Sequence, residues 1–370
     1  MKKSQIGIIG FAVTSLGVLS TLPVQGAEVE KTFKVSGQVN RVVTFTDDGD
    51  NTYVRHVDNN ASVSRFILTG EAKSKDLTIG ATLELGLNPN NSADTNQANS
   101  NASQNPGTID HRAAEIYFEG RYGMLSIGNG DSASDGITET DLSGTDVASG
   151  IALYPVDGFT FLQDGEKGGT TAGTVTPGPA ISDVFSSLSG LERADRVRYD
   201  TPSFQGFTLS ASTQEGGNLD AKLSYEANVE GVDVAAAAGY ANTASTSSNG
   251  GQYGASASAA FANGFNVTLA LAGQENETAN SDNPFLWYGK LGYRMEIFGM
   301  GETAFSVDYH SVNDLAQNND EARSYGVQVV QNMDAYGTEL YAAFRNFSLD
   351  RTGKNYQDIT AGWLGARVTF

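Results

Sequence analysis

Two groups of charged residues carry the chemistry that this sequence can do. The first is acidic and lies in one polar stretch: Asp131, Asp135, Glu139, Asp141 and Asp146. The second is basic and lies in segments that alternate apolar and polar residues: Arg65, Arg196 and Arg198. If the two rows face each other, they create a transverse field that orders water and penalises apolar solutes. The acidic row has a second interpretation, as the solvated surface of an external loop.

Catalytic and metal-binding arrangements are missing from the sequence. The histidines are His56, His111 and His310, and none has a metal-ligand spacing such as H-E-x-x-H. No G-x-S-x-G elbow and no P-loop occur, so we predict neither an enzyme nor a cofactor. The run Asp47-Asp-Gly-Asp50 could bind calcium, but it lacks the full EF-hand spacing and is better interpreted as an ordinary acidic loop.

The N-terminus predicts export. Lys2 and Lys3 precede an apolar stretch from Ile6 to Leu19, and small residues follow it up to Gly26. This pattern is typical of a secretory signal peptide, so we expect residues 1–26 to be removed and 27–370 to form the mature chain. The chain has no cysteine and a formal net charge of −20. Its stability must therefore come from something other than disulfides, and nucleic acid is excluded as a partner because phosphates would be repelled.

Strict alternation indicates the elements that position the charged groups. In residues 77–87, Leu, Ile, Ala, Leu, Leu and Leu occupy the odd positions and Thr, Gly, Thr, Glu and Gly the even ones. Such a segment predicts a strand with one apolar face. No apolar run approaches the roughly 18 residues of a transmembrane helix. The pattern therefore predicts an all-β protein whose apolar faces meet lipid.

The connections between these strands alternate in length. Short ones carry turn residues, as at 121–123 and 262–264, and longer polar segments lie between them, at 47–61, 88–110, 131–192, 215–218, 242–251, 274–284, 312–321 and 349–356. About sixteen strands are predicted, with both chain ends on the short-turn side. Membrane barrels have this organisation, with short periplasmic turns and long external loops. We therefore predict one transmembrane antiparallel β-barrel over residues 27–370.

Outward-facing aromatic residues are expected in two rows. The periplasmic row, near the short turns, contains Phe118, Phe207, Phe261, Phe265 and Phe370. The external row, near the long loops, contains Phe45, Tyr240, Tyr253, Phe285, Tyr309 and Tyr325. Membrane barrels carry such girdles at both interfaces. Phe370 also ends the chain in register with an amphipathic last strand, which is similar to the signal read by the outer-membrane assembly machinery.

The lipid-facing rows determine where basic side chains point. Arg or Lys facing lipid at mid-bilayer costs ~2–4 kcal/mol, so a basic residue inside a strand should face the lumen. Arg65 and the pair Arg196 and Arg198 obey this rule, as do Lys222, Lys290, Arg294, Arg345 and Arg367. Arg41 and Arg112 do not fit the alternation. We expect them at a bulge, at a rim or at a subunit contact.

Four segments resemble the Gram-negative porin family, in its sixteen-stranded general diffusion type. They are FKVSGQVNR at 33–41, SRFILTGEA at 64–72, RVRYDTPSFQGF at 196–207 and GARVTF at 365–370. The resemblance implies a homotrimer of barrels in the bacterial outer membrane, in contact with lipid and lipopolysaccharide. It also implies that the third loop folds into the lumen, here from within residues 131–192. The Pro-Glu-Phe-Gly stretch common in that loop is missing.

Three functions are compatible with these observations. The first is a water-filled channel for passive diffusion of small hydrophilic solutes and ions. The second is a substrate-selective channel on the same scaffold, for which Tyr117, Tyr288 and Tyr341 would be lumen-facing aromatics. The third is a plugged barrel with a structural or adhesive role. For the first function, a diffusion channel, we expect the acidic loop to face Arg65, Arg196 and Arg198 and to favour cations modestly.

Overall fold

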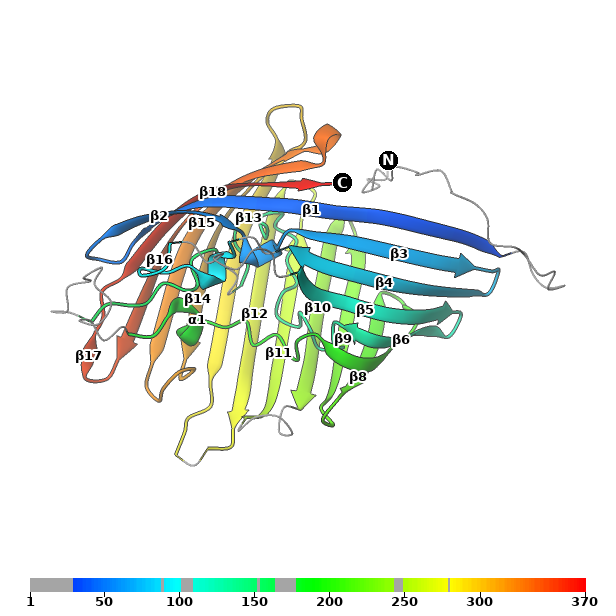
Figure 1. The fold of residues 1–370 in the computed structure, drawn as a ribbon, viewed down its shortest axis with the longest axis horizontal. Helices are drawn as coiled ribbons and strands as arrows, with labels where there is room; N and C mark the ends of the chain where they lie inside the picture. The colour runs from blue at the N-terminus through cyan, green and yellow to red at the C-terminus, as the bar shows by residue number, and fades with distance from the viewer. Residues whose placement is uncertain are drawn as a thin grey trace.

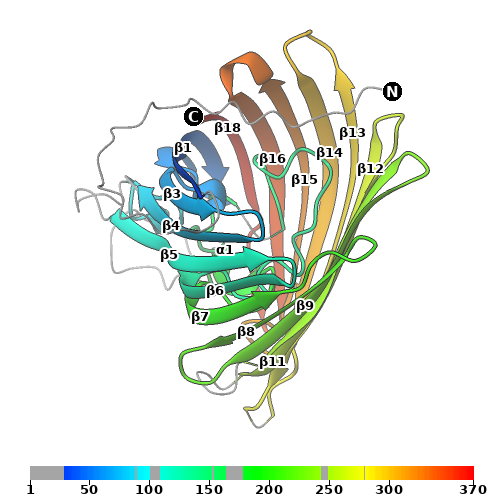
Figure 2. The same ribbon diagram turned by 90° about the vertical axis from the view of Figure 1, so that its right-hand side faces the viewer.

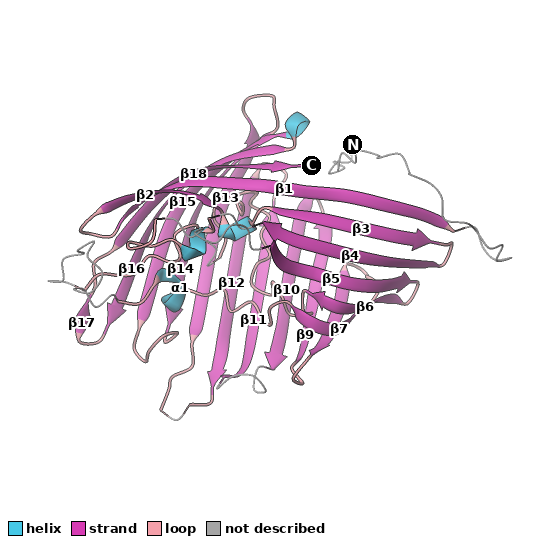
Figure 3. Ribbon diagram, in the orientation of Figure 1, coloured by secondary structure: helices cyan, strands magenta, loops and turns pink. Residues whose placement is uncertain are grey.

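The computed structural model describes residues 29–87, 90–100, 109–151, 154–163, 178–242, 249–278 and 280–370. Nearly every regular element is a strand (Figures 1 and 3). In the first half these are β1 Glu30–Asp47, β2 Thr52–Asp58, β3 Arg65–Lys73, β4 Leu77–Leu87, β5 Ile109–Gly120, β6 Gly123–Gly130, β7 Ala194–Asp200, β8 Phe207–Gln214 and β9 Leu219–Val229. In the second half they are β10 Val232–Asn242, β11 Asn249–Ala260, β12 Phe265–Asn276, β13 Phe285–Glu296, β14 Glu302–Asn313, β15 Glu321–Met333, β16 Thr338–Arg351, β17 Lys354–Asn355 and β18 Ile359–Thr369. The helical elements are η1 Asn60–Ser62, η2 Ser92–Asp94, α1 Ile181–Val184 and η3 Asp334–Tyr336.

The strands close into an antiparallel barrel, as predicted. Each long strand pairs with its neighbours in sequence, and β1 pairs with β18 to complete the circle (Figure 1). β2 and β3 both pair with β1, so they form one interrupted barrel strand, and β17 is a two-residue extension in the last loop. Counted in this way the barrel has 16 strands.

One expected connection is wrong. The polar segment 47–61 was predicted as a single long loop, but Thr52–Asp58 forms β2 and pairs with β1 through a tight turn. The segment forms a strand despite its polar composition. Its backbone groups are hydrogen-bonded to β1, and every second side chain of β2 lies on the outer face. The chain then breaks at Asn59, forms η1, and resumes as β3.

The period of two separates an apolar outer face from a polar inner one. On β12, Asn266 and Thr268 are buried inside the barrel, whereas Phe265, Leu269 and Leu271 are exposed outside. The side chains expected in the two aromatic rows lie on this outer face, with Phe45, Tyr240 and Tyr253 each 45% exposed. An apolar exterior is stable only in lipid, so the barrel spans a membrane with its strands.

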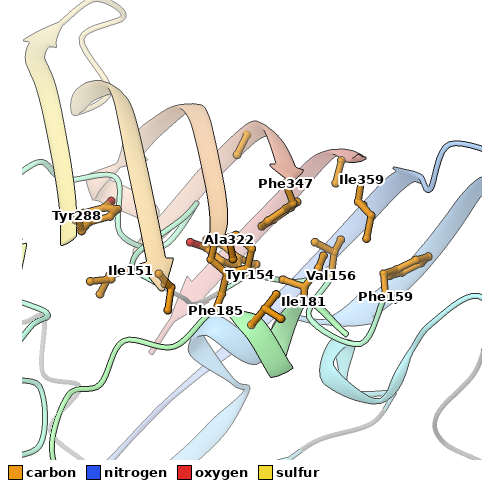
Figure 4. Packing of buried hydrophobic residues seen from close by; sticks show 14 of the residues in the cluster. Ile151, Tyr154, Val156, Phe159, Ile181, Phe185, Tyr288, Ala322, Phe347 and Ile359 are labelled. Carbon is orange, nitrogen blue, oxygen red and sulfur yellow. The ribbon is translucent and has the colours of Figure 1, made fainter. Parts of the chain in front are cut away.

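An apolar cluster also lies inside the barrel, separate from the apolar outer face. Residues 154–163 and 178–188 bury Tyr154, Phe159, Ile181 and Phe185 against the inner wall (Figure 4). The wall contributes residues from β2 and from β14 to β18, including Val57, Val312, Ala322, Phe347, Ile359 and Trp363. Figure 2 shows α1 enclosed by the strands. The described parts of the connection between β6 and β7, residues 131–151, 154–163 and 178–193, therefore pack on the inner side of the barrel.

The expected signal peptide, residues 1–26, lies outside the described residues and stays a prediction. Within the described ranges, no helix is long and apolar enough to cross a membrane.

Candidate functional site

Residues 131–151, here called the lumen loop, run along the inner wall from strand to strand. Ala133 N donates to Ser212 Oγ of β8 (2.9 Å), and Ser134 N donates to Asp220 Oδ2 of β9 (2.6 Å). Next, Thr140 N and Leu142 N donate to Ser256 Oγ and Ser258 Oγ of β11, at 3.2 and 2.9 Å. Three serine hydroxyl groups and the Asp220 carboxylate of the wall therefore satisfy backbone groups that water would otherwise bind.

The second half of the lumen loop continues around the wall to the last strand. Thr145 Oγ1 shares a hydrogen bond of 2.7 Å with Ser306 Oγ on β14. Arg345 on β16 donates to Ser149 Oγ (3.0 Å), and Trp363 Nε1 on β18 donates to Ala148 O (2.8 Å). The loop thus contacts the wall from β8 to β18, and it leaves the wall of β3 to β6 on the opposite side.

Asp141 anchors the lumen loop. Its Oδ2 lies 2.6 Å from Nζ of Lys290 on β13, and both side chains are largely buried. Burial alone would raise the pKa of Asp141, but the charge of Lys290 and its hydrogen bonds with Lys290 and Ser143 lower that pKa below its usual range. Asp141 is therefore ionised and neutralised by Lys290, so it contributes little free charge to the lumen.

Asp131 and Asp135 lie at the start of the lumen loop. Asp131 Oδ1 is 2.5 Å from Arg193 Nε, which neutralises it. Burial, followed by the negative charges of Asp131 and Glu139, raises the pKa of Asp135 to about 7. Asp135 is therefore only partly ionised near neutral pH.

Glu139 and Asp146 are the acids that face the open lumen. Both side chains are exposed, and neither makes an ion pair with any described residue. They line a cavity of about 130 Å³, together with Asp141 and Tyr288. The opposite side of this cavity is made by Ala61, Ser62 and Arg367. We call the region around this cavity, between the lumen loop and that wall, the constriction.

Arg65, at the start of β3, lies beside η1 on the wall. Its Nη1 lies 2.9 Å from Glu84 Oε1, and its Nη2 donates to Ser62 Oγ (3.2 Å). Arg112 reaches the same carboxylate oxygen at 2.6 Å. Two guanidinium groups therefore share one carboxylate, which leaves a positive charge at this point.

Arg112 points inward because of a β-bulge. On β4, Glu84 and Leu85 are consecutive, but on β5 their partners are Ala113 and His111, so Arg112 is the extra residue. The sequence-based expectation of a bulge, rim or subunit contact is therefore resolved in favour of the bulge. The alternation of apolar and polar residues alone could not show this, because a bulge moves every residue beyond it to the opposite face of the strand.

Arg367 completes the basic side of the constriction. Its Nε and Nη2 both donate to the carboxylate of Glu339 on β16, at 2.9 Å for Nη2. Its Nη1 donates to Ser62 Oγ at 3.1 Å. Ser62 thus accepts from both Arg65 and Arg367 and joins them into one row. The sequence predicted that Arg367 faces inward, but η1, which brings Ser62 to it, had no recognisable signal.

Arg196 and Arg198 lie elsewhere than expected. Instead of facing the lumen loop across the lumen, they bind its first residues from β7. Arg196 Nε donates to Asp131 O (2.9 Å), and Arg198 Nη1 donates to Ser132 O (2.9 Å). They also pair with Glu115 and Asp200. The reason is chain connectivity, because β7 is hydrogen-bonded to β6, from whose end the lumen loop starts.

The turn that contains Asp47, Asp48 and Asp50 is stabilised by its own side chains. Asp47 Oδ1 accepts from Gly49 N (2.9 Å), and Asp48 Oδ1 accepts from Asn51 N (2.8 Å). Within the described part of the chain, no three His, Cys, Asp or Glu residues are arranged to hold a metal ion. The hydrogen bonds therefore account for the acidic residues here as members of an ordinary β-turn.

A family model described as Gram-negative porin matches residues 12–352. The chain belongs to the Gram-negative porin family. This porin is a channel of the bacterial outer membrane for passive diffusion of small hydrophilic solutes and ions. No curated protein sequence matches it.

Solved structures confirm the porin fold. The anion-selective porin from Comamonas acidovorans has a TM-score of 0.63 at 14% identity, with 92% of this chain and 100% of that chain covered. The outer membrane channel DcaP of Acinetobacter baumannii has a TM-score of 0.58 at 11% identity and covers 95% of this chain and 100% of its own. OmpT of Vibrio cholerae, in its trimer form, has a TM-score of 0.57 at 13% identity and covers 92% and 99%. At these identities the likeness concerns the fold.

Proposed function

We propose that this porin prefers small cations modestly and that the constriction sets this preference. Its acidic side is Glu139 and Asp146 on the lumen loop, with Asp135 contributing when ionised. Its basic side is the row Arg65, Arg112 and Arg367. The observation that carries the proposal is the cavity of about 130 Å³ that Glu139, Asp146 and Arg367 line together.

The balance of charge at the constriction supports a cation preference. Glu139 and Asp146 are not neutralised by any described ion-pair partner, whereas Arg367 is paired with Glu339. Arg65 and Arg112 together retain one positive charge after sharing Glu84. Negative charge therefore exceeds positive charge near the narrowest point. Charges elsewhere in the chain matter less, because salt screens them beyond about 10 Å at 0.1 M.

A substrate-selective channel is less well supported. Of the aromatics considered for that role, Tyr288 and Tyr341 are buried, and their hydroxyl groups bind Asp308 (3.0 Å) and Asn40 (2.7 Å). Tyr117 binds Glu71 at 2.5 Å. These rings therefore serve the wall and do not form a continuous aromatic path for a solute.

The N-terminal pattern and membership of the porin family support three further parts of the proposal. These are removal of residues 1–26 as a signal peptide, insertion by the outer-membrane assembly machinery with Phe370 as its signal, and a homotrimer surrounded by lipid and lipopolysaccharide. Passive diffusion requires neither catalysis nor a cofactor. Nucleic acid is not a partner, since the acidic chain would repel it.

The test is a reversal-potential measurement across a planar bilayer with a salt gradient. We expect the double variant Glu139→Gln/Asp146→Asn to shift the reversal potential toward anions, most strongly at low salt. The matched control is Asp47→Asn/Asp50→Asn, which removes the same charge from the external β1–β2 turn. Equal shifts in both variants would refute the assignment of the constriction, and the absence of ion conductance in the unaltered protein would refute the channel itself.

A further inference from the structure

The outer face of the barrel has a groove over β8 to β12, strands that lie side by side in the wall (Figure 2). Its floor is formed by alanines of β10 and β11, and its two sides by larger apolar residues of β9 and β12. The groove has a volume of about 410 Å³. Its sides stand roughly 14 Å apart at the backbone, because they are three strand spacings from each other. Two rows of paired residues cross it in register: Tyr225, Ala236, Ala257 and Leu269 form one, and Leu223, Ala238, Ala255 and Leu271 form the other.

The two ends of the groove differ. On the external side the next pair is Tyr240 and Tyr253. The Tyr240 ring lies over Gly251 and the Tyr253 ring over Gly273, where an added Cβ would collide with them. On the periplasmic side the next row has no aromatic side chain and consists of Ala227, Val234, Ala259 and Val267. The groove is therefore closed by rings toward the external surface and open toward the periplasm.

The surroundings of the groove determine what kind of molecule fills it. Because the barrel spans a membrane with its strands, this face is in contact with hydrocarbon and not with water. An unfilled space beside the alanines would forfeit dispersion contacts on both surfaces. Small residues also let an apposed chain approach the backbone closely. Acyl chains, which can adapt to the shape of the groove, therefore pack on the alanine floor.

The charge of this sector of the barrel selects the headgroup. Between Arg198 and Lys290 the only basic residue in the sequence is Lys222, whose Nζ donates to Asp135 O in the lumen (2.7 Å). The periplasmic rim beside the open end of the groove instead exposes three acids, Glu226, Glu230 and Asp233. Within the described ranges, none of these three acids forms an ion pair. An anionic headgroup is repelled here, whereas an ammonium group is attracted.

We infer that the groove binds a phospholipid of the inner leaflet whose headgroup carries a primary ammonium group. Its acyl chains lie on the alanine floor, and its ammonium group lies at the periplasmic rim near Glu230 and Asp233. The inference rests on the proposed lipid surroundings of the barrel and specifies one lipid and its position. Lipopolysaccharide does not fit this groove, because its phosphate groups are negative and the external end is closed.

Fluorescence quenching in vesicles tests the identity of the lipid. Trp287 on β13 is paired with Leu271 in the side of the groove and is 43% exposed on the outer face. The other tryptophan, Trp363, is buried inside the barrel, so quenching by brominated acyl chains reports on Trp287. The vesicles contain equal amounts of phosphatidylethanolamine and phosphatidylglycerol, with bromine on the acyl chains of one or the other.

We expect brominated phosphatidylethanolamine to quench Trp287 about twofold more strongly than brominated phosphatidylglycerol, as for one exposed ion pair, and the difference to shrink at high salt. Equal quenching by the two lipids, or stronger quenching by phosphatidylglycerol, would overturn the inference. Quenching by neither lipid would show that protein covers the groove, which would also overturn it.

Two pairs of variants locate the acyl chains and the headgroup. Ala236→Phe/Ala257→Phe fills the groove and should abolish the difference between the two lipids, whereas Val307→Phe/Val327→Phe adds the same rings elsewhere on the outer face and should preserve it. Glu230→Gln/Asp233→Asn should also abolish the difference, whereas Glu275→Gln/Glu277→Gln, toward the external side, should not. A difference that persists in the groove or rim variant, or that is lost in either control, would contradict the inference.

Ion conductance of each variant shows whether the barrel has folded. It also separates this test from that of the proposed function. A protein that conducts ions with its cation preference but shows no preference between the two lipids would refute the lipid site alone.

Discussion

Lys290 on β13 and Asp141 of the lumen loop form a buried ion pair with 2.6 Å between Nζ and Oδ2. The same ammonium donates to Ser149 O at 3.0 Å, so one side chain holds two points of the loop. This ion pair is therefore one of the contacts that hold the lumen loop against the wall.

The first prediction concerns this anchor. Lys290→Met leaves Asp141 buried without its partner, and breaking a buried pair in this way costs about 3–5 kcal/mol. We expect the loop to detach locally, with larger single-channel conductance and more open-channel noise. Lys290→Met/Asp141→Leu should recover part of the unaltered behaviour, and Lys75→Met, in an exposed turn, should have no effect. Unchanged conductance in the single variant would show that the loop does not depend on this pair.

The second prediction concerns the basic row. Arg112→Gln removes one of the two guanidinium groups that share Glu84, while Arg65 still neutralises that carboxylate. We expect a stronger cation preference, measured as the reversal potential in a salt gradient. Arg198→Gln removes the same charge at the base of the lumen loop and should shift the reversal potential less. A larger shift from Arg198→Gln would favour the wall residues originally predicted from the sequence.

The third prediction concerns pH. The pKa of Asp135 is raised to about 7 by burial and then by the charges of Asp131 and Glu139. Asp135 therefore gains a negative charge as the pH rises through about 7, and cation preference should increase between pH 6 and pH 8. Because the raised pKa disfavours the charged form in the folded state, the stability associated with this group falls as the pH rises from about 3.8, the usual pKa, to about 7, and it changes little above that pH. Asp135→Asn should remove this step in the reversal potential, and its persistence would assign the step to another group.

The fourth prediction concerns the C-terminus. Deletion of Phe370 removes the contact with Phe66 and the backbone pairing with Gly37. Its ring is 54% exposed on the outer face, so we expect a loss of at most about 1–2 kcal/mol in barrel stability. We expect assembly in cells to fall much more, because Phe370 is the proposed assembly signal. Refolding yield in detergent and the amount in the outer membrane measure the two effects separately, and normal outer-membrane levels would contradict the prediction.

The sequence alone determined the barrel and the face on which most side chains lie. Alternation has a period of two whatever the neighbouring strands are, so local patterns in segments such as 77–87 were sufficient. Because a charged side chain is unfavourable in lipid, the sequence also predicted that Lys290, Arg345 and Arg367 lie inside the barrel, where the structure has them. These conclusions need no knowledge of which strands meet across the lumen.

Only the tertiary structure decided which charges meet. Arg112 faces the lumen because of a bulge, and Ser62 reaches Arg65 and Arg367 because β2 and β3 are interrupted at η1. Arg196 and Arg198 bind the base of the lumen loop because β7 lies beside β6. A one-residue irregularity moves every later residue of a strand to the opposite face. The path of a loop depends on wall residues up to 215 positions away in the sequence, as for Ala148 and Trp363. Local periodicity contains neither kind of information.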